Sequence, residues 1–485
     1  MKVSEKFSLG ISQGGLDFVD VDVVNDVPLF VDPSAIRVQQ GEWSDWCQTL
    51  LQSFFGELLE AISRDDVLRI RQLIYPLVEP NETHLGVGRG PSQGRGLGHG
   101  AMSAKLVRSL AGSRAAQTGL LRDLEDTALF VEGIGRDIIS DITTNIIRVA
   151  LIAYTQQMCD FHGIPVEEQT SGALWDPDEA NWDDRLVMLP RGEGDKLILV
   201  PKSLVRISTQ TDVGKYYRGY IRPYLVAEEE ANPGSDLIRI LRDGTRKVIL
   251  GDLDERVGQD KDTIVRKTEE FPGAFDKFKA SNTIEKNLPL EHDALRIQTA
   301  SPQIDLQELL DAVLAVRPGN AGATSYHRAV AALLTALFDA VLGNEKIEVE
   351  LHGGLKRIDI TYDNIAGYGF FRWLSLNYPA AIIAIECKNY SDDPANEVLD
   401  QLVGRFGTNR GKVGIVVCRK FQNKARFLDR CKASAGDGQG FALVLDDDDL
   451  QAMVDEATAL LVSPSNERGE FSILRAQFDR LIGLA

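Results

Sequence analysis

The stretch "IAIECKNYSDD" (residues 383–393) places an acid and a base two residues apart at the end of an apolar run. The run "AAIIAI" (380–385) predicts a buried strand. On a strand, residues two apart project to the same face, so Glu386 and Lys388 point together while Cys387 faces the core. A buried strand that ends by presenting both charges on one face favours a chemical site, and the alternative is a surface ion pair on a solvated face.

The segments around this strand predict the rest of a domain. An amphipathic helix (325–343) and two strands (within 346–363) precede it, and a long piece, 364–380, leads into it. A helix (395–411), a strand (412–419), a helical segment (423–434) and a final strand (440–450) follow. This order predicts an α/β fold with a mixed central sheet flanked by helices.

A second carboxylate is available on one of the earlier strands. Asp359 stands in "LKRIDI" (355–360), and if this strand neighbours the first one, its carboxylate can lie beside Glu386. Two carboxylates with a backbone carbonyl and waters provide the oxygen ligands that Mg²⁺ prefers. Such an ion would polarise a phosphodiester and lower the pKa of a bound water, while Lys388 could orient that water or offset charge on the phosphate.

An Asp followed downstream by Glu-x-Lys at the end of an apolar strand resembles the PD-(D/E)xK nuclease superfamily, and its restriction-endonuclease-like, Mrr-type branch in particular. The resemblance covers about residues 305–450. It implies a catalytic set of Asp359, Glu386 and Lys388, with Mg²⁺ as the cofactor and Mn²⁺ able to substitute. It also implies a role for Gln401 on the following helix and a further metal-binding acid, for which Glu348 and Glu350 are candidates and Glu350 is favoured.

Basic side chains near this site predict contacts to nucleic acid. Arg405 lies one helical turn after Gln401 and would share its face, where it could touch a phosphate. The basic strip at 411–432, which includes Arg419, Lys420 and Lys424, could grip a phosphate backbone. The alternative for the strip is a helix with a solvated positive face.

The bulk composition limits the classes of function. The 485 residues predict two or three domains, and the net charge of −19 argues against coating of nucleic acid through bulk charge, so any such contact must be local. Five cysteines without a CxxC pair indicate reduced thiols. No apolar run is long enough to span a membrane and no secretory signal is evident, so we expect a cytoplasmic protein without a membrane partner.

The chain divides into three predicted parts. Residues 1–205 predict an α+β domain with strands near 16–36, a glycine-rich loop at 86–100 and a long buried helix from Gly135 to Gly163. The loop, with Arg89 and Arg95, could cradle a phosphate or be a surface loop. Residues 206–304 predict a connector of short amphipathic helices, "SDLIRIL" (235–241) among them, and residues 305–485 form the nuclease-like domain.

The leading hypothesis is a Mg²⁺-dependent endonuclease acting on DNA. The large N-terminal region would serve as a sensor or specificity module that responds to an unknown trigger or regulatory ligand, an architecture that resembles antiphage defence effectors. A homo-oligomer is expected, because cutting two strands takes two sites. Two alternatives remain open: a non-cleaving nucleic-acid or nucleotide sensor, and a nuclease directed at RNA.

Overall fold

A computed structural model describes residues 1–86, 107–110, 112–207, 213–281, 288–351, 356–390, 396–407, 410–462 and 469–484. The structure contains two separate hydrophobic cores. The first contains buried side chains from Val3 to Leu295, and the second contains Phe161 and side chains from Leu306 to Leu481. The predicted connector therefore packs into the core of the N-terminal region.

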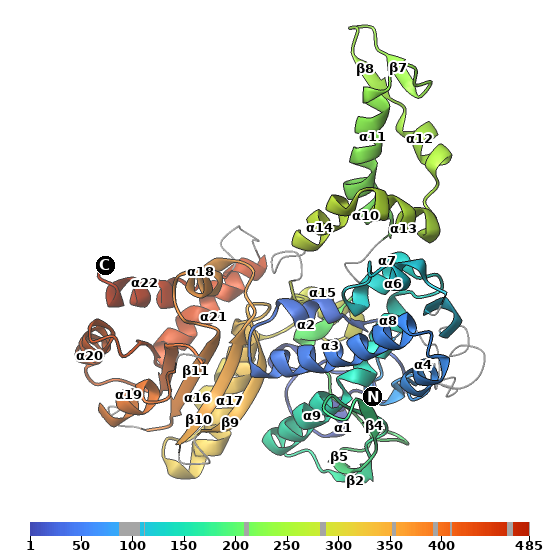
Figure 1. Ribbon diagram of the computed structural model, residues 1–485. Coiled ribbons are helices and arrows are strands. Elements are labelled where there is room, and N and C mark those ends of the chain that lie inside the picture. Colours follow the sequence, from blue (N-terminus) through green and yellow to red (C-terminus); the bar gives the residue numbers. More distant parts are fainter. Residues whose placement is uncertain are drawn as a thin grey trace.

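The C-terminal core surrounds a five-stranded sheet in the order β13-β12-β11-β10-β9. The strands are β9 (Leu342–Leu351), β10 (Lys356–Asn364), β11 (Ile382–Lys388), β12 (Val413–Cys418) and β13 (Phe441–Leu445). Strand β10 is antiparallel to both of its neighbours, β9 and β11, whereas β11, β12 and β13 are parallel to one another. The predicted mixed sheet is confirmed, and Figure 1 shows helices on its two sides.

The predicted helices of this part occur in the predicted order, with further helices before and after them, and every residue of the interior strand β12 is buried. The segment 364–380 contains an additional helix whose Phe370 and Phe371 are buried in the second core, so these aromatic rings pack locally. The helices are α16 (Leu306–Ala315), α17 (Ala323–Leu337), α18 (Gly369–Asn377), α19 (Asn396–Val403), α20 (Lys424–Gly436), α21 (Asp447–Val462) and α22 (Ser472–Leu481).

The N-terminal region is mainly helical, with short strands. Its described helices are α1 (Val3–Lys6), α2 (Pro33–Val38), α3 (Glu42–Ser63), α4 (Val67–Ile74), α6 (Arg114–Gln117), α7 (Thr127–Phe130), α8 (Arg136–Ile146) and α9 (Arg148–His162). Its strands are β1 (Phe30–Val31), β2 (Glu167–Thr170), β3 (Leu174–Asp176), β4 (Asn181–Asp183), β5 (Leu186–Leu189) and β6 (Val205–Arg206).

Two predictions for this region are wrong in detail. Within 16–36 only β1 is a strand, because the alternating valines are buried in irregular extended chain instead of pairing along their length. The expected long helix is two helices, α8 and α9, which meet at 70°. Among the described residues no single helix is long and apolar enough to cross a membrane. Taken together, α8 and α9 have sufficient length and apolar composition, but the pair is bent.

The connector contains a hairpin that the sequence analysis assigned to a helix. Residues 235–241 include β7 (Ile238–Ile240), which pairs antiparallel with β8 (Arg246–Val248). The turn contains Asp243 and Gly244, and Gly244 has φ 83°, a conformation that favours glycine. The helices are α10 (Val213–Tyr216), a π-helical turn (Tyr217–Ile221), α11 (Arg222–Ala231), α12 (Leu250–Val257), α13 (Lys261–Glu270), α14 (Pro272–Ala280) and α15 (His292–Thr299).

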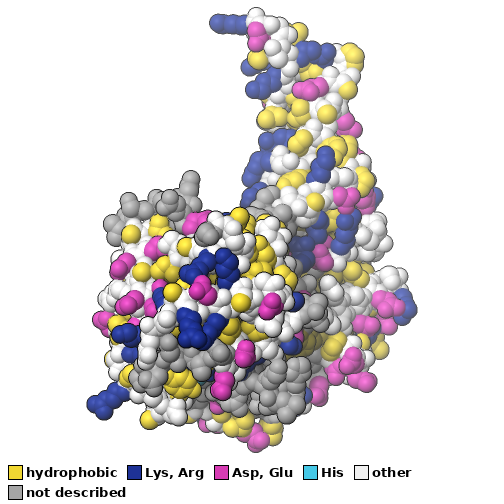
Figure 2. Space-filling model, turned by 90° about the vertical axis from the view of Figure 1, so that its left-hand side faces the viewer, with side chains coloured by type: hydrophobic (Ala, Val, Ile, Leu, Met, Phe, Trp, Pro, Cys, Tyr) yellow, Lys and Arg dark blue, Asp and Glu magenta, His cyan; other side chains and the backbone are white. Residues whose placement is uncertain are grey.

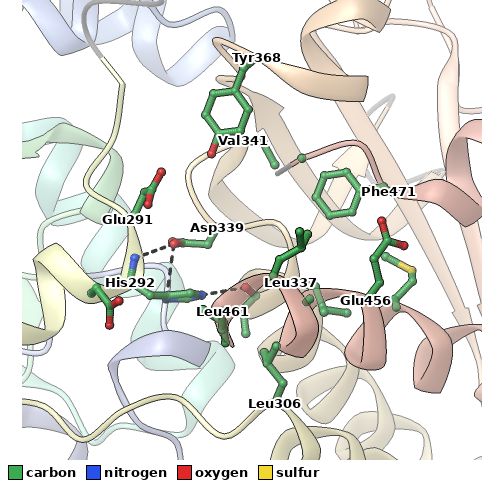
Figure 3. A pocket seen from close by; sticks show the side chains of 16 residues that line it. Glu291, His292, Leu306, Leu337, Asp339, Val341, Tyr368, Glu456, Leu461 and Phe471 are labelled. Carbon is green, nitrogen blue, oxygen red and sulfur yellow. Dashed lines mark hydrogen bonds and ion pairs between the residues drawn. The ribbon is translucent and has the colours of Figure 1, made fainter. Parts of the chain in front are cut away.

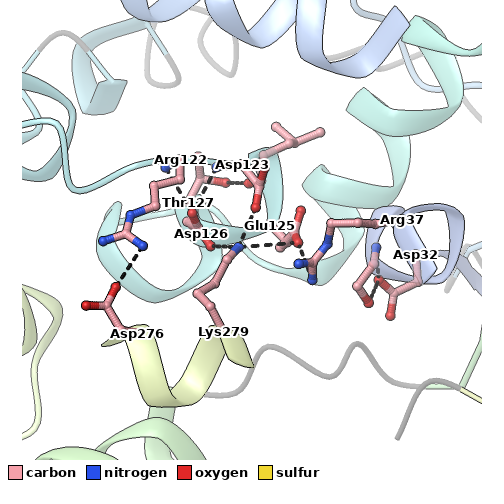
Figure 4. Close-up of polar contacts among 11 residues, drawn as sticks. Asp32, Arg37, Arg122, Asp123, Glu125, Asp126, Thr127, Asp276 and Lys279 are labelled. Atoms are coloured by element: carbon pink, nitrogen blue, oxygen red, sulfur yellow. Dashed lines mark hydrogen bonds and ion pairs between the residues drawn. The ribbon is translucent and has the colours of Figure 1, made fainter. Parts of the chain in front are cut away.

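A half-buried cation, Lys279, joins the connector to the N-terminal region (Figure 4). Lys279 Nζ of α14 lies 2.5 Å from Asp123, 2.8 Å from Asp126 and 3.6 Å from Glu125. Burial raises the pKa of Glu125 to about 7, although Lys279 and Arg37 oppose that rise. The ammonium group of Lys279 therefore lies near all three acids, and Arg37 forms a second ion pair with Glu125 at 3.0 Å.

Replacing Lys279 with methionine is expected to lower the free energy of unfolding by about 2 kcal/mol. The change removes the cation and leaves buried carboxylates without their main partner, and protonation of Glu125 offsets only part of the loss. Urea unfolding at pH 8, where Glu125 is mostly ionised, measures it. The matched control is Lys277→Met, because the ammonium of Lys277 is exposed and lies over the ring of Tyr224. Equal midpoints for both variants would contradict the prediction.

Candidate active site

The pairing of β10 with β11 brings the two predicted acids together. Ile360 pairs with Ile385, so the next cross-strand position places Asp359 opposite Glu386. Directly opposite residues of an antiparallel pair project to the same face, with Cβ atoms about 5 Å apart. Asp359 Oδ2 also accepts a hydrogen bond of 2.8 Å from the backbone N–H of Cys387. The backbone of one strand therefore fixes the carboxylate of the other.

Glu386 is a buried acid held by two cations. Its side chain is 1% exposed, Lys388 Nζ lies 2.6 Å from Oε1, and Arg405 Nη1 donates to Oε2. Burial raises the pKa of Glu386, and the nearby Asp359 carboxylate raises it further, whereas Lys388 and Arg405 oppose the change. Burial works against the charge of Lys388, but Glu386 outweighs it and raises the pKa of the ammonium. The carboxylates of Asp359 and Glu386 and the cationic groups of Lys388 and Arg405 thus lie close together.

Two carboxylates, those of Asp359 and Glu386, are available to bind a divalent cation at this site. Asp359 and Glu386 offer oxygen ligands, and His327 Nε2 lies 3.9 Å from Asp359 Oδ2. Within the described residues, no group of three His, Cys, Asp or Glu side chains is arranged to hold a metal. The register of β9 and β10 puts Glu348 opposite Asp359 and Glu350 opposite Arg357, but the side chains of both glutamates lie outside the described part. The oxygen-rich donor pair suits Mg²⁺ chemically.

The helix after β11 carries the other two predicted residues. Gln401 is exposed on α19, and in the described structure it has no hydrogen bond to Asp359, Glu386 or Lys388. Arg405 follows the end of α19 and contacts Glu386, a carboxylate, where we expected a phosphate partner. Arg405 therefore belongs to the acid–base cluster itself.

Two residues of the predicted basic strip are engaged within the protein. Arg419 donates to the carbonyl oxygens of Val313 and Leu314 at the end of α16, at 2.8 Å and 3.1 Å. Lys424 forms ion pairs with Asp446 and Asp449. Lys420 is exposed. Arg419 and Lys424 thus stabilise the domain in this structure, and Lys420 alone of the three points to solvent. Arg89 and Arg95 lie outside the described residues.

A buried polar junction that the sequence analysis missed connects the N-terminal region to the sheet. Asp17 Oδ2 accepts hydrogen bonds from the backbone N–H of Glu345 in β9 (3.0 Å) and from Tyr154 Oη (2.8 Å). Asn344 donates to Gln39 Oε1 (2.9 Å) and to Asp363 Oδ2 (3.1 Å). The sequence signal was the alternation of acidic and apolar residues before residue 33. Such alternation does not distinguish a buried acid from a solvated one.

Several acids of this junction have raised pKa values. Burial raises the pKa of Glu345 to about 8, and the nearby Asp17 carboxylate adds to the effect. Burial raises the pKa of Asp363 to about 6, against the opposing charge of Lys346. The pKa of Asp17 is also raised by burial, although Lys202 opposes the shift. These acids therefore make the junction sensitive to pH.

An apolar cavity lies where the connector meets the C-terminal core (Figure 3). It encloses about 850 Å³ of empty space, part of it open to solvent, between the start of α15, the end of α17 and α21. At its edge, His292 donates its backbone N–H to Asp339 (2.7 Å), and its Nε2 lies 2.8 Å from the carbonyl oxygen of Ala336. Asp359, Glu386, Lys388 and Arg405 do not line it, so it is distinct from the candidate site.

Comparison with known proteins informs only the N-terminal region. Residues 8–212 match a family model described as a domain of unknown function, DUF8370. No curated protein and no solved structure matches the chain. The match ends close to residue 205, where the sequence analysis placed the first boundary, and it leaves the sheet with Asp359 and Glu386 outside it.

Proposed function

We propose that the chain is a Mg²⁺-dependent endonuclease that hydrolyses phosphodiester bonds of DNA at the site formed by Asp359, Glu386 and Lys388. The observation that carries the proposal is the cross-strand placement of Asp359 opposite Glu386, with Lys388 Nζ 2.6 Å from the Glu386 carboxylate. Residues 1–304 would control this activity, in keeping with a role in antiphage defence. The resemblance to PD-(D/E)xK nucleases supports the assignment of reaction class.

The chain's own residues would divide the work. A bound Mg²⁺ would supply an activated water and a positive charge at the scissile phosphate. Asp359 and Glu386 would hold the ion, and Asp359 is already oriented by the N–H of Cys387. Lys388, which stays charged beside Glu386, would stabilise negative charge that develops on the phosphate. Arg405 would exchange its contact with Glu386 for one with a phosphate oxygen.

The contacts of Glu386 also favour a second candidate, a protein that retains this fold without cleavage. Lys388 and Arg405 already neutralise the buried carboxylate, so in this arrangement it needs no metal ion. Such a protein would bind nucleic acid or a nucleotide as a sensor. The two candidates differ in whether a divalent cation binds at Asp359 and Glu386.

Plasmid nicking tests the nuclease proposal. Supercoiled DNA is incubated with the wild-type chain in Mg²⁺ or in EDTA, and with the Glu386→Gln variant in Mg²⁺. We expect nicking only by the wild type with Mg²⁺, and a loss of roughly a thousandfold in the variant. Glu397→Gln is the matched control, because Glu397 is an exposed acid on α19. An RNA substrate is run in parallel, and cleavage of RNA alone would reassign the substrate.

Calorimetry with Mn²⁺ separates the two candidates when the wild type needs an unidentified trigger. The nuclease proposal predicts a binding site that disappears in Glu386→Gln and persists in Glu397→Gln. Identical Mn²⁺ isotherms for all three proteins, together with no nicking, would refute it in favour of the non-cleaving sensor.

A further inference from the structure

The middle of the connector, from α11 through β7 and β8 to α12 (residues 222–257), forms an arm that projects from the body of the protein, and the β7–β8 hairpin is at its far end (Figure 1). In the hairpin, Arg239 pairs with Lys247 and Ile240 pairs with Arg246. The turn is closed by a backbone hydrogen bond of 2.9 Å from Leu241 to Thr245, and the Asp243 carboxylate accepts the N–H of Thr245. The tip is therefore a defined two-stranded ribbon.

The hairpin concentrates positive charge on an acidic chain. Residues 238–248 include Arg239, Arg242, Arg246 and Lys247, all exposed, against the single acid Asp243. No ion pair with a carboxylate is found for these four cations within the described residues, and Arg246 makes a hydrogen bond of 3.4 Å to the carbonyl oxygen of Asn232. Figure 2 shows further Lys and Arg side chains along the arm. The whole chain carries −19.

Repulsion between two of these cations lowers the stability of the hairpin unless an anion is bound. Arg239 and Lys247 stand directly opposite each other, and like charges at such positions destabilise a hairpin. They also share the face opposite to that of Val248, which is buried. A polyanion against this exposed face would remove the repulsion.

We propose that the β7–β8 hairpin binds duplex DNA, entering the major groove as a two-stranded ribbon. The major groove of B-DNA, about 12 Å wide, admits such a ribbon, whereas the major groove of A-form RNA is too narrow and deep for side chains to read. Leu241, at the tip, is 39% exposed and follows the alternation of Arg239, so it can contact thymine methyl groups from the same face. The choice of DNA rests on the proposed function.

The hairpin would be a second contact, separate from the cleavage site. The arm points away from the five-stranded sheet that carries Asp359 and Glu386 (Figure 1). Binding by the hairpin would therefore hold the protein on DNA independently of the acids, so hairpin substitutions are expected to weaken binding without altering metal affinity.

Fluorescence anisotropy with the full-length chain and a labelled 24-base-pair duplex, in EDTA to prevent cleavage, tests the proposal. The variant replaces all four hairpin cations with glutamine: Arg239→Gln, Arg242→Gln, Arg246→Gln and Lys247→Gln. The control makes the same change in net charge at exposed arginines elsewhere: Arg64→Gln, Arg71→Gln, Arg108→Gln and Arg185→Gln. At about 0.1 M salt we expect the hairpin variant to bind at least tenfold more weakly, and the control to bind within about twofold of the wild type.

The salt dependence supplies a second readout. Loss of four phosphate contacts should reduce the slope of log Kd against log salt by about 3 to 4. The pair Arg239→Gln with Lys247→Gln keeps the test sound if the fourfold variant folds poorly, because removing the repulsion should leave the hairpin at least as stable. This pair should lower the slope by about 2.

Four results would overturn the inference: no affinity of the wild type for the duplex, equal binding by the hairpin variant, equal affinity for an RNA duplex, or binding only to phosphatidylserine vesicles. The outcome is distinguishable from that of the nuclease proposal. Plasmid nicking by the wild type together with unchanged binding by the hairpin variant would refute the hairpin alone. Weakened binding by the variant without any metal-dependent nicking would refute the nuclease alone.

Discussion

Replacing Asp359 with asparagine is expected to slow plasmid nicking at least a thousandfold while leaving the unfolding midpoint unchanged. The asparagine keeps an oxygen that can accept the N–H of Cys387, so the local hydrogen bond of 2.8 Å survives. It loses the negative charge that would hold a divalent cation with Glu386. A thousandfold loss corresponds to about 4 kcal/mol of transition-state stabilisation.

This variant is a cleaner test than one at Glu386. Removing the Glu386 charge leaves Lys388 and Arg405 without their partner in a buried place, and the lost activity could then follow from local unfolding.

The double variant Asp359→Asn, Glu386→Gln should lose no more activity than the more severe single variant, because the effects of residues that act as one unit are not additive. Asp400→Asn, an exposed acid on α19, is the control. Nicking by Asp359→Asn within tenfold of the wild type would contradict the proposed site.

The second prediction is a fall in stability as pH rises, caused by the buried junction around β9. The pKa of Glu345 is about 8 in the folded chain, against an ordinary value of 4.5 that applies when the chain unfolds. Between these values the folded state holds a proton that the unfolded state releases, so stability falls as pH increases from about 4.5 to 8. The difference corresponds to at most roughly 3 to 5 kcal/mol. The raised pKa values of Asp17 and Asp363 act in the same direction.

Urea unfolding at pH 5.5 and at pH 8.5 measures this effect. Glu345→Gln removes the ionisation and retains a side-chain oxygen that can accept the hydrogen bond from Thr335. We expect the stability of the variant relative to the wild type to increase by about 2 kcal/mol or more between pH 5.5 and pH 8.5. Glu308→Gln, at an exposed position on α16, should follow the wild type. Parallel pH profiles for wild type and Glu345→Gln would show that Glu345 is not the titrating group.

The features that depend on local pattern could be predicted from the sequence. The period of two in "IAIECK" places Glu386 and Lys388 on one face, and alternating apolar runs and helical segments give the order of the C-terminal elements. The hairpin at 238–248 had a local signal as well, the Asp243–Gly244 turn, but the charged segment 235–241 also fits a short amphipathic helix. The bend between α8 and α9 follows tertiary packing, which the continuous apolar pattern does not reveal.

The partners of the basic side chains on distant segments could not be predicted. Arg419 and Lys424 lie in a basic strip that suits a phosphate backbone, and only the folded chain brings the end of α16 to Arg419 and the acids Asp446 and Asp449 to Lys424. The Arg405 contact with Glu386 depends equally on where the chain runs after α19. Charge along a sequence therefore indicates what a surface could bind, and the fold decides which charges remain free to do so.

Strand β9 gives the region matched by DUF8370 a direct mechanical connection to the candidate site. Asp17, inside that region, holds the backbone of Glu345, and three residues further along β9 the chain stands opposite Asp359. At about 3.3 Å per residue this separation is roughly 10 Å. A rearrangement that displaces Asp17 must either break its hydrogen bond to Glu345 or move β9 with it. Because β9 is hydrogen-bonded to β10, a shift of β9 would also change the position of Asp359 relative to Glu386.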